Sequence, residues 1–371
     1  MQSRVQLGQI WGIPIGLHSS WFIIFLLLTF SLAVGYFPAE YEDLSRPVYW
    51  LLGAVTSVLF FGSVLAHELA HAWVALRNSI PVRSITLFIF GGVAQIEQEP
   101  HTAGAEFRIA IAGPIMSLAL AGLFFVLYQV DQPVDYLAAP SIYLARINLI
   151  LGLFNMIPGF PLDGGRVLRA VIWRVTGSLR RATKIAGTVG QVVAFGFMAW
   201  GALMLLSGAV FNGLWIMFIG WFLQNAAVSV VAQSNLQEAL SGITVGQIMS
   251  RECLMIPREQ PLRDLVEERI LRGGNRCFMV GSGDRMDGML TLRDVGAVPQ
   301  EQWDHLTAVD IMIPWNELAR VEPQTELFDA LRTMEGKNVA QLPVVEGNQL
   351  VGVLTREQVL RFVHTRSQLG V

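Results

Sequence analysis

Two histidines and a glutamate stand together in an otherwise apolar stretch, in the order His67-Glu68-Leu69-Ala70-His71. Histidines four residues apart project from one face of a helix about a turn apart, which suits two nitrogen ligands of one zinc ion. Glu68 lies beside them, where it can take a proton from a zinc-bound water. A lone helical histidine is more often a hydrogen-bonded core residue, but three ionisable groups in one apolar span are costly. We therefore interpret this cluster as a functional site.

A catalytic zinc ion takes three protein ligands and leaves one position for water. Asp163 is the candidate for the third ligand, because it follows an apolar stretch and a turn rich in proline and glycine at residues 158–161. Aspartate also suits the N-cap of a helix, and a helix is expected over residues 166–176. The two roles are compatible, and both remain open from the sequence.

The composition indicates a membrane protein. Of the 371 residues, 53% are hydrophobic and only 15% are charged, which is too apolar for one soluble domain. A helix needs about 20 apolar residues to cross the hydrocarbon. The segments that qualify or come close are Ile15–Tyr36, Val48–Leu76, Phe107–Val130, Ser141–Met156, Ile185–Leu206 and Phe211–Val231. They predict a polytopic α-helical membrane protein with six transmembrane helices.

Loop charges predict the orientation of these spans, because lysine and arginine are in excess on the cytoplasmic side. The loop after the first expected span carries Glu40 and Glu42, whereas Arg77 and Arg83 follow the second. We therefore expect an integral membrane protein with both termini in the cytoplasm. The histidine pair and Asp163 lie toward the cytoplasmic ends of their spans, so the active site is expected on that side.

Residues 84–95, between the second and third spans, are rich in strand-forming residues and contain the pair Gly91-Gly92. This pattern predicts a β-strand or hairpin and not a further crossing of the membrane. Because the segment is apolar, we expect a membrane-associated β-hairpin beside the helical bundle.

Beyond the last span, charges appear every few residues and two segments share one pattern. One begins at Thr244 and contains a helical pattern at Leu262–Arg272, and the other begins at Thr307 and contains a helical pattern at Leu327–Glu335. Short apolar strands follow each helical pattern, which predicts an internal repeat of α/β units. The predicted domains are a six-span membrane domain at 1–231, a linker at 232–243, and repeats at 244–300 and 301–371.

The His67-Glu68-x-x-His71 motif in a membrane span has a second motif downstream, Asn155-x-x-Pro158-x-x-Pro161-Leu162-Asp163-Gly164. Together they resemble the signature of the site-2 protease family of intramembrane zinc metalloproteases. The resemblance covers about Gly12 to Val231. No PDZ-like domain is inserted between the motifs, so the chain is similar to the branch that has six spans and cystathionine-β-synthase (CBS) repeats.

The resemblance implies roles for five residues. His67, His71 and Asp163 would hold one Zn²⁺ ion, Glu68 would be the general base, and Asn155 would be a polar active-site residue that holds the substrate backbone or the oxyanion. The implied reaction is hydrolysis of a peptide bond within or near the transmembrane segment of a single-span membrane protein, as in regulated intramembrane proteolysis. A helical substrate must first unwind, and the strand at Ile85–Gln95 is expected to pair with the unwound segment.

The two repeats resemble CBS domains, which pair into a Bateman module that often binds ATP, ADP or AMP between the repeats. The resemblance implies that Thr291 and Asp294 contact the ribose and phosphates of an adenosine nucleotide. In the second repeat Gln358 follows Thr355 where the family has an aspartate, so that repeat departs from the pattern. A folded pair that serves homodimerisation without a ligand remains open.

Other functions are disfavoured by the same sequence. A net charge of −3 without a basic stripe argues against nucleic acid as a partner. The alternative function is a CBS-regulated membrane transporter or channel, which predicts inverted repeats or a polar path through several spans. The polar residues gather around one cluster instead. A catalytically inactive scaffold is disfavoured because the metal-binding candidates and Glu68 are all present.

Overall fold

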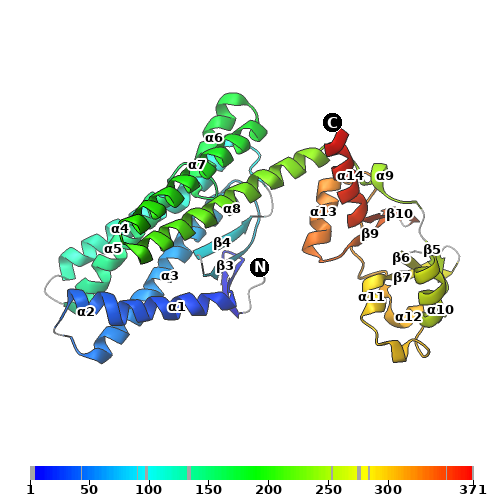
Figure 1. Ribbon diagram of the computed structural model, residues 1–371, viewed down its shortest axis with the longest axis horizontal. Coiled ribbons are helices and arrows are strands. Elements are labelled where there is room, and N and C mark those ends of the chain that lie inside the picture. The colour runs from blue at the N-terminus through cyan, green and yellow to red at the C-terminus, as the bar shows by residue number, and fades with distance from the viewer. Residues whose placement is uncertain are drawn as a thin grey trace. The chain divides into compact units, whose positions relative to one another are not determined.

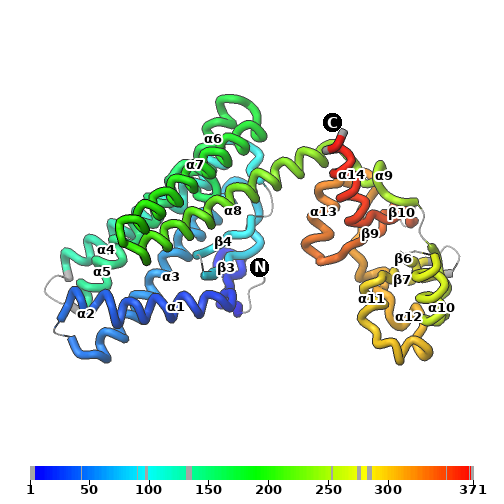
Figure 2. Tube along the Cα trace, in the orientation of Figure 1, coloured from blue at the N-terminus to red at the C-terminus, as the bar shows by residue number. Residues whose placement is uncertain are grey.

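The computed structural model divides the chain into two units, Met1–Ser234 and Asn235–Val371. Figure 2 traces the first unit from blue to green and the second from yellow-green to red. The structure describes residues 5–42, 44–89, 91–96, 99–131, 135–251, 254–273, 277–282, 285–347 and 349–369.

In the described part of the chain, six helical segments are long and apolar enough to cross a membrane, which confirms the predicted number of spans. The first is α1 (Ser19–Ser31), continued by η1 (Leu32–Tyr36) and α2 (Phe37–Glu40). The others are α3 (Arg46–Arg77), α4 (Ala103–Asp131), α5 (Asp135–Asn155), α7 (Leu179–Leu206) and α8 (Val210–Leu240), and Figure 1 labels all the α-helices among them. Side chains such as Leu26, Val126 and Phe195 stay exposed on these helices. Exposed apolar surface of this extent is suited to lipid.

The bounds of the spans differ from the prediction by several residues at some ends. The first begins at Ser19 and not at Ile15, because Ile13–Leu17 forms a β-strand. The fourth is a full-length span, Tyr136–Asn155, because Pro140 lies inside the helix and does not precede it. Prolines are tolerated inside membrane helices, where neighbouring groups satisfy the freed backbone. Helix α8 continues beyond Val231 to Leu240, so most of the segment expected as a linker is helical.

A four-stranded sheet lies beside the bundle in the order β1-β2-β3-β4 (Figure 1). Its strands are β1 (Val5–Ile10), β2 (Ile13–Leu17), β3 (Val82–Phe88) and β4 (Gly91–Ile96). The antiparallel pair β3 and β4 is the predicted hairpin, whereas the last three residues of β2, from Ile15 to Leu17, were predicted to belong to the first span. Strand β2 pairs in parallel with β3, so both sides of β3 are occupied and β4 is an edge of the sheet.

The sheet is held against α3 by apolar packing. Ile13 of β2, Ile85 of β3 and Ala72 of α3 form one buried cluster. Burial of apolar surface stabilises such contacts by about 25 cal/mol per Å². Because Ala72 is next to His71, the sheet is fastened to α3 at the turn that carries the second histidine.

Helix α6 (Asp163–Thr176) follows α5 after a short loop and ends at Gly177, whose φ of 67° is left-handed. The loop packs closely on its surroundings through glycines. A Cβ atom at Gly165 would overlap the backbone of Gly159, and one at Gly190 of α7 would overlap the backbone of Phe160. These close approaches hold the loop before Asp163 between α6 and α7.

The C-terminal unit contains two α/β repeats. The first comprises α9 (Val245–Ile248), β5 (Leu254–Ile256), α10 (Leu262–Asp264), η2 (Leu265–Arg272), β6 (Cys277–Ser282), β7 (Arg285–Thr291), α11 (Leu292–Gly296) and η3 (Gln300–Gln302). The second comprises α12 (Ala308–Ile311), β8 (Ile313–Pro314), α13 (Leu327–Gly336), β9 (Gln341–Glu346), β10 (Gln349–Thr355) and α14 (Arg356–Leu369).

The two repeats exchange their first helices. Val245 of α9 is buried in the core formed by Leu327 and Leu342 of the second repeat. Ala308 of α12 is buried in the core formed by residues of the first repeat, among them Leu262. Each repeat therefore needs the other to complete its apolar core.

Candidate active site

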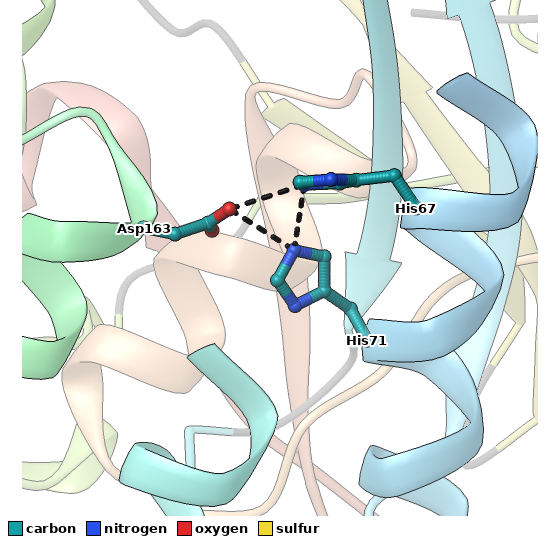
Figure 3. Close-up of side chains that lie close together, drawn as sticks. All are labelled: His67, His71 and Asp163. Atoms are coloured by element: carbon teal, nitrogen blue, oxygen red, sulfur yellow. Dashed lines mark hydrogen bonds and ion pairs between the residues drawn. The ribbon is translucent and has the colours of Figure 1, made fainter. Parts of the chain in front are cut away.

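The predicted metal ligands converge in space although 92 positions separate His71 from Asp163 (Figure 3). Both histidines extend from α3, and Asp163 faces them from the first residue of α6. Asp163 Oδ2 lies 3.1 Å from His67 Nε2 and 3.2 Å from His71 Nε2, and the two Nε2 atoms lie 3.2 Å apart. Both histidines are 5% exposed.

The chemistry of these atoms suits a cation. His71 Nδ1 lies 2.6 Å from the carbonyl oxygen of Ile109, which only accepts hydrogen bonds, so Nδ1 carries the hydrogen. In a neutral imidazole this leaves an unshared electron pair on Nε2, which points toward an aspartate oxygen. Three atoms that each lie about 2.0–2.1 Å from a tetrahedral zinc ion are ~3.3 Å apart. The observed separations are close to that value, so the residues fit zinc.

Asp163 is not an N-cap, which corrects one of the two roles left open by the sequence. Leu162 occupies the N-cap position of α6 with extended backbone, and Asp163 is the first helical residue. Burial acts to raise the pKa of the Asp163 carboxyl, but hydrogen bonds and charges of His67 and His71 outweigh burial and hold that pKa well below its usual range. The side chain is therefore an ionised carboxylate directed at the histidines.

Residues of helix α4 contact both histidines, although the sequence motifs did not include them. Ser117 Oγ lies 2.8 Å from His67 Nδ1, and the carbonyl of Ile109 accepts from His71. A Cβ atom at Gly113 would overlap the Nε2 atoms of both histidines, so only glycine leaves room there. Residues 109, 113 and 117 are spaced by four and share one helix face. That spacing is the signal that could have found them.

Glu68 is directed toward the sheet and not toward Asp163. Its Oε2 atom accepts a hydrogen bond of 3.2 Å from the backbone N–H of Ala94 in β4. A Cβ atom at Gly92 would overlap Glu68 Cγ, so this strand also limits where the carboxylate can lie. Strand β4 therefore positions the glutamate that lies between the histidines in sequence.

The five predicted site residues all line one cavity of about 620 Å³. Asn155 is among them, and its Nδ2 atom donates to the carbonyl of Leu151 over 3.0 Å. Arg166 also lines this cavity, although no sequence motif had selected it. The apolar walls come from α1, α3 and α5 and comprise Ile24, Leu28, Phe60, Phe61, Val64, Tyr143, Ile147 and Leu151. An apolar peptide segment suits such walls.

Thr291 and Asp294 line a separate cavity of about 430 Å³ in the C-terminal unit. Asp294 Oδ2 accepts from the N–H and the hydroxyl of Thr291, at 2.8 and 2.7 Å, and so caps α11. Gln358 makes the same two bonds to Thr355, at 2.8 and 3.1 Å. The glutamine therefore retains the capping role of the aspartate that it replaces.

The cavity beside Thr291 has a cationic lining. Arg293 and Lys337 line it together with Arg356, whose buried Nε atom has no hydrogen-bond partner among the described residues. Such a lining suits an anionic ligand. The lining residues come from both repeats, so the cavity exists only when the repeats are paired.

Sequence comparisons place this chain among known proteins. Residues 55–139 and 132–197 match peptidase family M50, and residues 245–296 and 308–365 match the CBS domain. The chain is 34% identical to sll0528 of Synechocystis sp., across 98% of this chain and 97% of that protein. It is 36% identical to Rip3 of Mycobacterium tuberculosis, across 98% of this chain and 93% of that protein. Both relatives carry provisional names as zinc metalloproteases.

Among solved structures, the site-2 protease from Methanocaldococcus jannaschii is 32% identical, with a TM-score of 0.41, and the match covers 61% of this chain and 94% of that chain. The two full-length relatives exceed 30% identity over nearly the whole chain. The chain therefore belongs to peptidase family M50, as a membrane zinc metalloprotease of the site-2 protease family with paired CBS domains.

Proposed function

We propose that this metalloprotease hydrolyses peptide bonds within or near the transmembrane segment of single-span membrane proteins. In this proposal His67, His71 and Asp163 hold the zinc ion, and Glu68 is the general base. The observation that carries it is the convergence of three ligand atoms at 3.1–3.2 Å from one another in the lining of a largely apolar cavity.

Zinc, when bound, lowers the pKa of a water molecule toward neutrality and polarises a carbonyl group. The Glu68 carboxylate, held by the Ala94 N–H, accepts the proton of the attacking water and then returns it to the leaving amine. The amide of Asn155 lines the same cavity and is suited to hold the substrate backbone or the developing oxyanion. An apolar substrate segment bound between the apolar walls would displace water, which would strengthen these polar interactions.

The substrate is proposed to bind as an added strand. Strand β3 is flanked by β2 and β4, so a substrate strand cannot pair with it at Leu87, whereas β4 is an edge. Residues of β4 line the cavity, and the backbone of Ala94 reaches Glu68. An unwound substrate segment paired with β4 would present its carbonyl groups beside Glu68.

Both termini are proposed to be cytoplasmic, with the active site toward that side. The support is the distribution of loop charges: Arg166, Arg169 and Arg174 lie on α6, and Arg180 and Arg181 at the start of α7. Such residues are enriched on the cytoplasmic side. Asp163 begins the same helix, which links the metal site to that side of the bilayer.

The CBS pair is proposed to bind an adenosine nucleotide in the cavity beside Thr291 and Asp294, and to support homodimerisation. The cationic lining suits phosphates. One carboxylate has about four acceptor positions, so Asp294 can cap α11 and still accept from a ribose hydroxyl. Because residues of both repeats line the cavity, a bound nucleotide would strengthen their pairing.

The first test compares wild-type protein with Glu68→Gln, purified in detergent. Zinc content and cleavage of a panel of single-span substrates are measured for both. We expect zinc in both proteins, and cleavage reduced about 10²- to 10⁴-fold in the variant, as for loss of a general base. Zinc-free wild-type protein, or unchanged cleavage by the variant, would contradict the site and favour the transport alternative.

A further inference from the structure

A buried ion pair joins α4 and α6 outside the metal site. Arg169 of α6 donates from Nε to Glu106 Oε1 over 2.6 Å, and its Nη2 donates to the same oxygen. Glu106 is fully buried and Arg169 is 9% exposed. The second carboxylate oxygen, Oε2 of Glu106, is buried without a hydrogen-bond partner among the described residues.

Stability alone is a weak explanation for this pair. Desolvating two charges costs several kcal/mol, and replacing a buried ion pair by apolar residues is often neutral or stabilising. A buried oxygen without a partner adds to the cost. A role in setting geometry is therefore the stronger explanation for charged residues at these two positions.

The position of Glu106 on α4 links it to the metal site. Residues 106, 109, 113 and 117 recur at spacings of three or four and form one stripe on the helix. Along this stripe Ile109 accepts from His71, Gly113 leaves room for both Nε2 atoms, and Ser117 contacts His67. The surface that orients the histidines therefore continues directly to Glu106.

The position of Arg169 links the same pair to Asp163. Its guanidinium carbon lies 5.3 Å from the centre of the Phe160 ring, in the loop immediately before α6. Arg169 thus contacts both α4 and the segment that delivers Asp163. The histidines come from α3 and the aspartate from α6. Because α4 contacts both the histidines and α6, it can set the position of one part of the ligand set relative to the other.

We propose that Glu106 and Arg169 are positioning residues, whose ion pair sets α6 against α4 so that Asp163 meets His67 and His71 at metal-ligand distance. This inference rests on the proposed metal site. Supporting groups around a metal typically change its affinity by 10- to 100-fold when they are removed.

The test uses full-length protein in detergent and the variants Glu106→Met, Arg169→Met and the double variant. Arg174→Met is the control, because Arg174 is an exposed arginine on the same helix. Zinc affinity is measured by chelator competition, the ligand geometry by the visible spectrum of bound Co²⁺, and folding by circular dichroism and thermal unfolding.

We expect each single variant to unfold at a lower temperature, because one member of the buried pair is left without the other. In Glu106→Met the loss should be the smaller one, since Arg169 still has the exposed Glu99 carboxylate at 3.8 Å. The double variant removes both charges and should recover thermal stability, yet bind zinc about 10- to 100-fold more weakly, with an altered Co²⁺ spectrum. Arg174→Met should match the wild type. If a single variant does not fold, the double variant still provides the test.

A double variant that binds zinc with wild-type affinity and an unchanged Co²⁺ spectrum would overturn the positioning role and leave a structural one. Asp163→Asn in the same assay separates this result from failure of the metal site itself. Unchanged zinc affinity in Asp163→Asn would contradict the ligand assignment, and with it the basis of the inference.

Discussion

The Nδ1 atom of His67 lies 2.8 Å from the Oγ atom of Ser117, across the contact between α3 and α4, and both side chains are buried. A partner on the distal nitrogen orients the imidazole ring, and the Ser117 hydroxyl can accept from Nδ1–H in the tautomer that leaves Nε2 free. His71 is held in the same way by the carbonyl of Ile109. Helix α4 therefore fixes the direction of both imidazoles.

Ser117→Ala should weaken zinc binding by about 10- to 100-fold, because it removes the oxygen that orients His67. Chelator competition measures this change. Ser57→Ala is the matched control, since Ser57 is a buried serine on α3 that accepts an interhelical hydrogen bond from Thr29. Equal losses of zinc affinity in both variants would indicate a general packing effect and contradict the specific role of Ser117.

Gly113→Ala should abolish zinc binding, because the added methyl group would overlap both Nε2 atoms. The control lies on the same helix: a Cβ atom at Gly122 meets nothing within 4 Å. Gly122→Ala should therefore retain zinc and activity. The zinc content of both purified variants is measured to test this prediction. Normal zinc content in Gly113→Ala would refute the proposed position of the ion.

Gly92→Ala should lower cleavage while zinc content stays unchanged. The new methyl group would overlap Glu68 Cγ and displace the general base. The zinc ion should stay bound, because the atoms nearest to that methyl group all belong to Glu68 and not to the histidines. A loss of about 10²-fold or more in kcat is expected from a misplaced base. Gly62→Ala on α3, where a Cβ atom meets nothing within 4 Å, is the control. Loss of zinc from Gly92→Ala would point to disruption of the whole site.

Thr291→Val should weaken binding of ATP, ADP or AMP by about 5- to 10-fold, the effect of one lost hydrogen bond. Isothermal titration calorimetry measures this change. Thr355→Val is the control, because Thr355 has an equivalent capping role and is not among the residues that line the cavity. Equal weakening of nucleotide binding in both variants would assign the effect to the lost helix caps. Absence of nucleotide binding to the wild-type protein would favour a module that serves homodimerisation alone.

The sequence was sufficient wherever the relevant residues are close along the chain. The spacing of His67 and His71 places them on one helix face in any fold, since the period of the α-helix is local. The apolar runs predicted six spans, and the Gly91-Gly92 pair within strand-forming residues predicted the hairpin of β3 and β4. Alternation of strands and helices likewise predicted the two C-terminal repeats.

Errors arose where tertiary contacts decide local structure. The segment from Ile15 to Leu17 continues the apolar run of the first span, yet it forms a strand because β3 supplies hydrogen-bond partners. In the same way, the exchange of α9 and α12 between the repeats depends on which apolar core each helix reaches. Neither outcome can be read from a local pattern.

The amino-acid order alone identifies the candidate site residues: two histidines on one helix face, a neighbouring glutamate, and an aspartate after a proline-rich turn. The packing of the helices was needed to show that Asp163 faces the histidines and does not cap its helix, and that Ser117 and Gly113 of α4 stand behind them. The physical reason is that side-chain spacing within a helix follows from its period, whereas contacts between helices depend on how their surfaces pack.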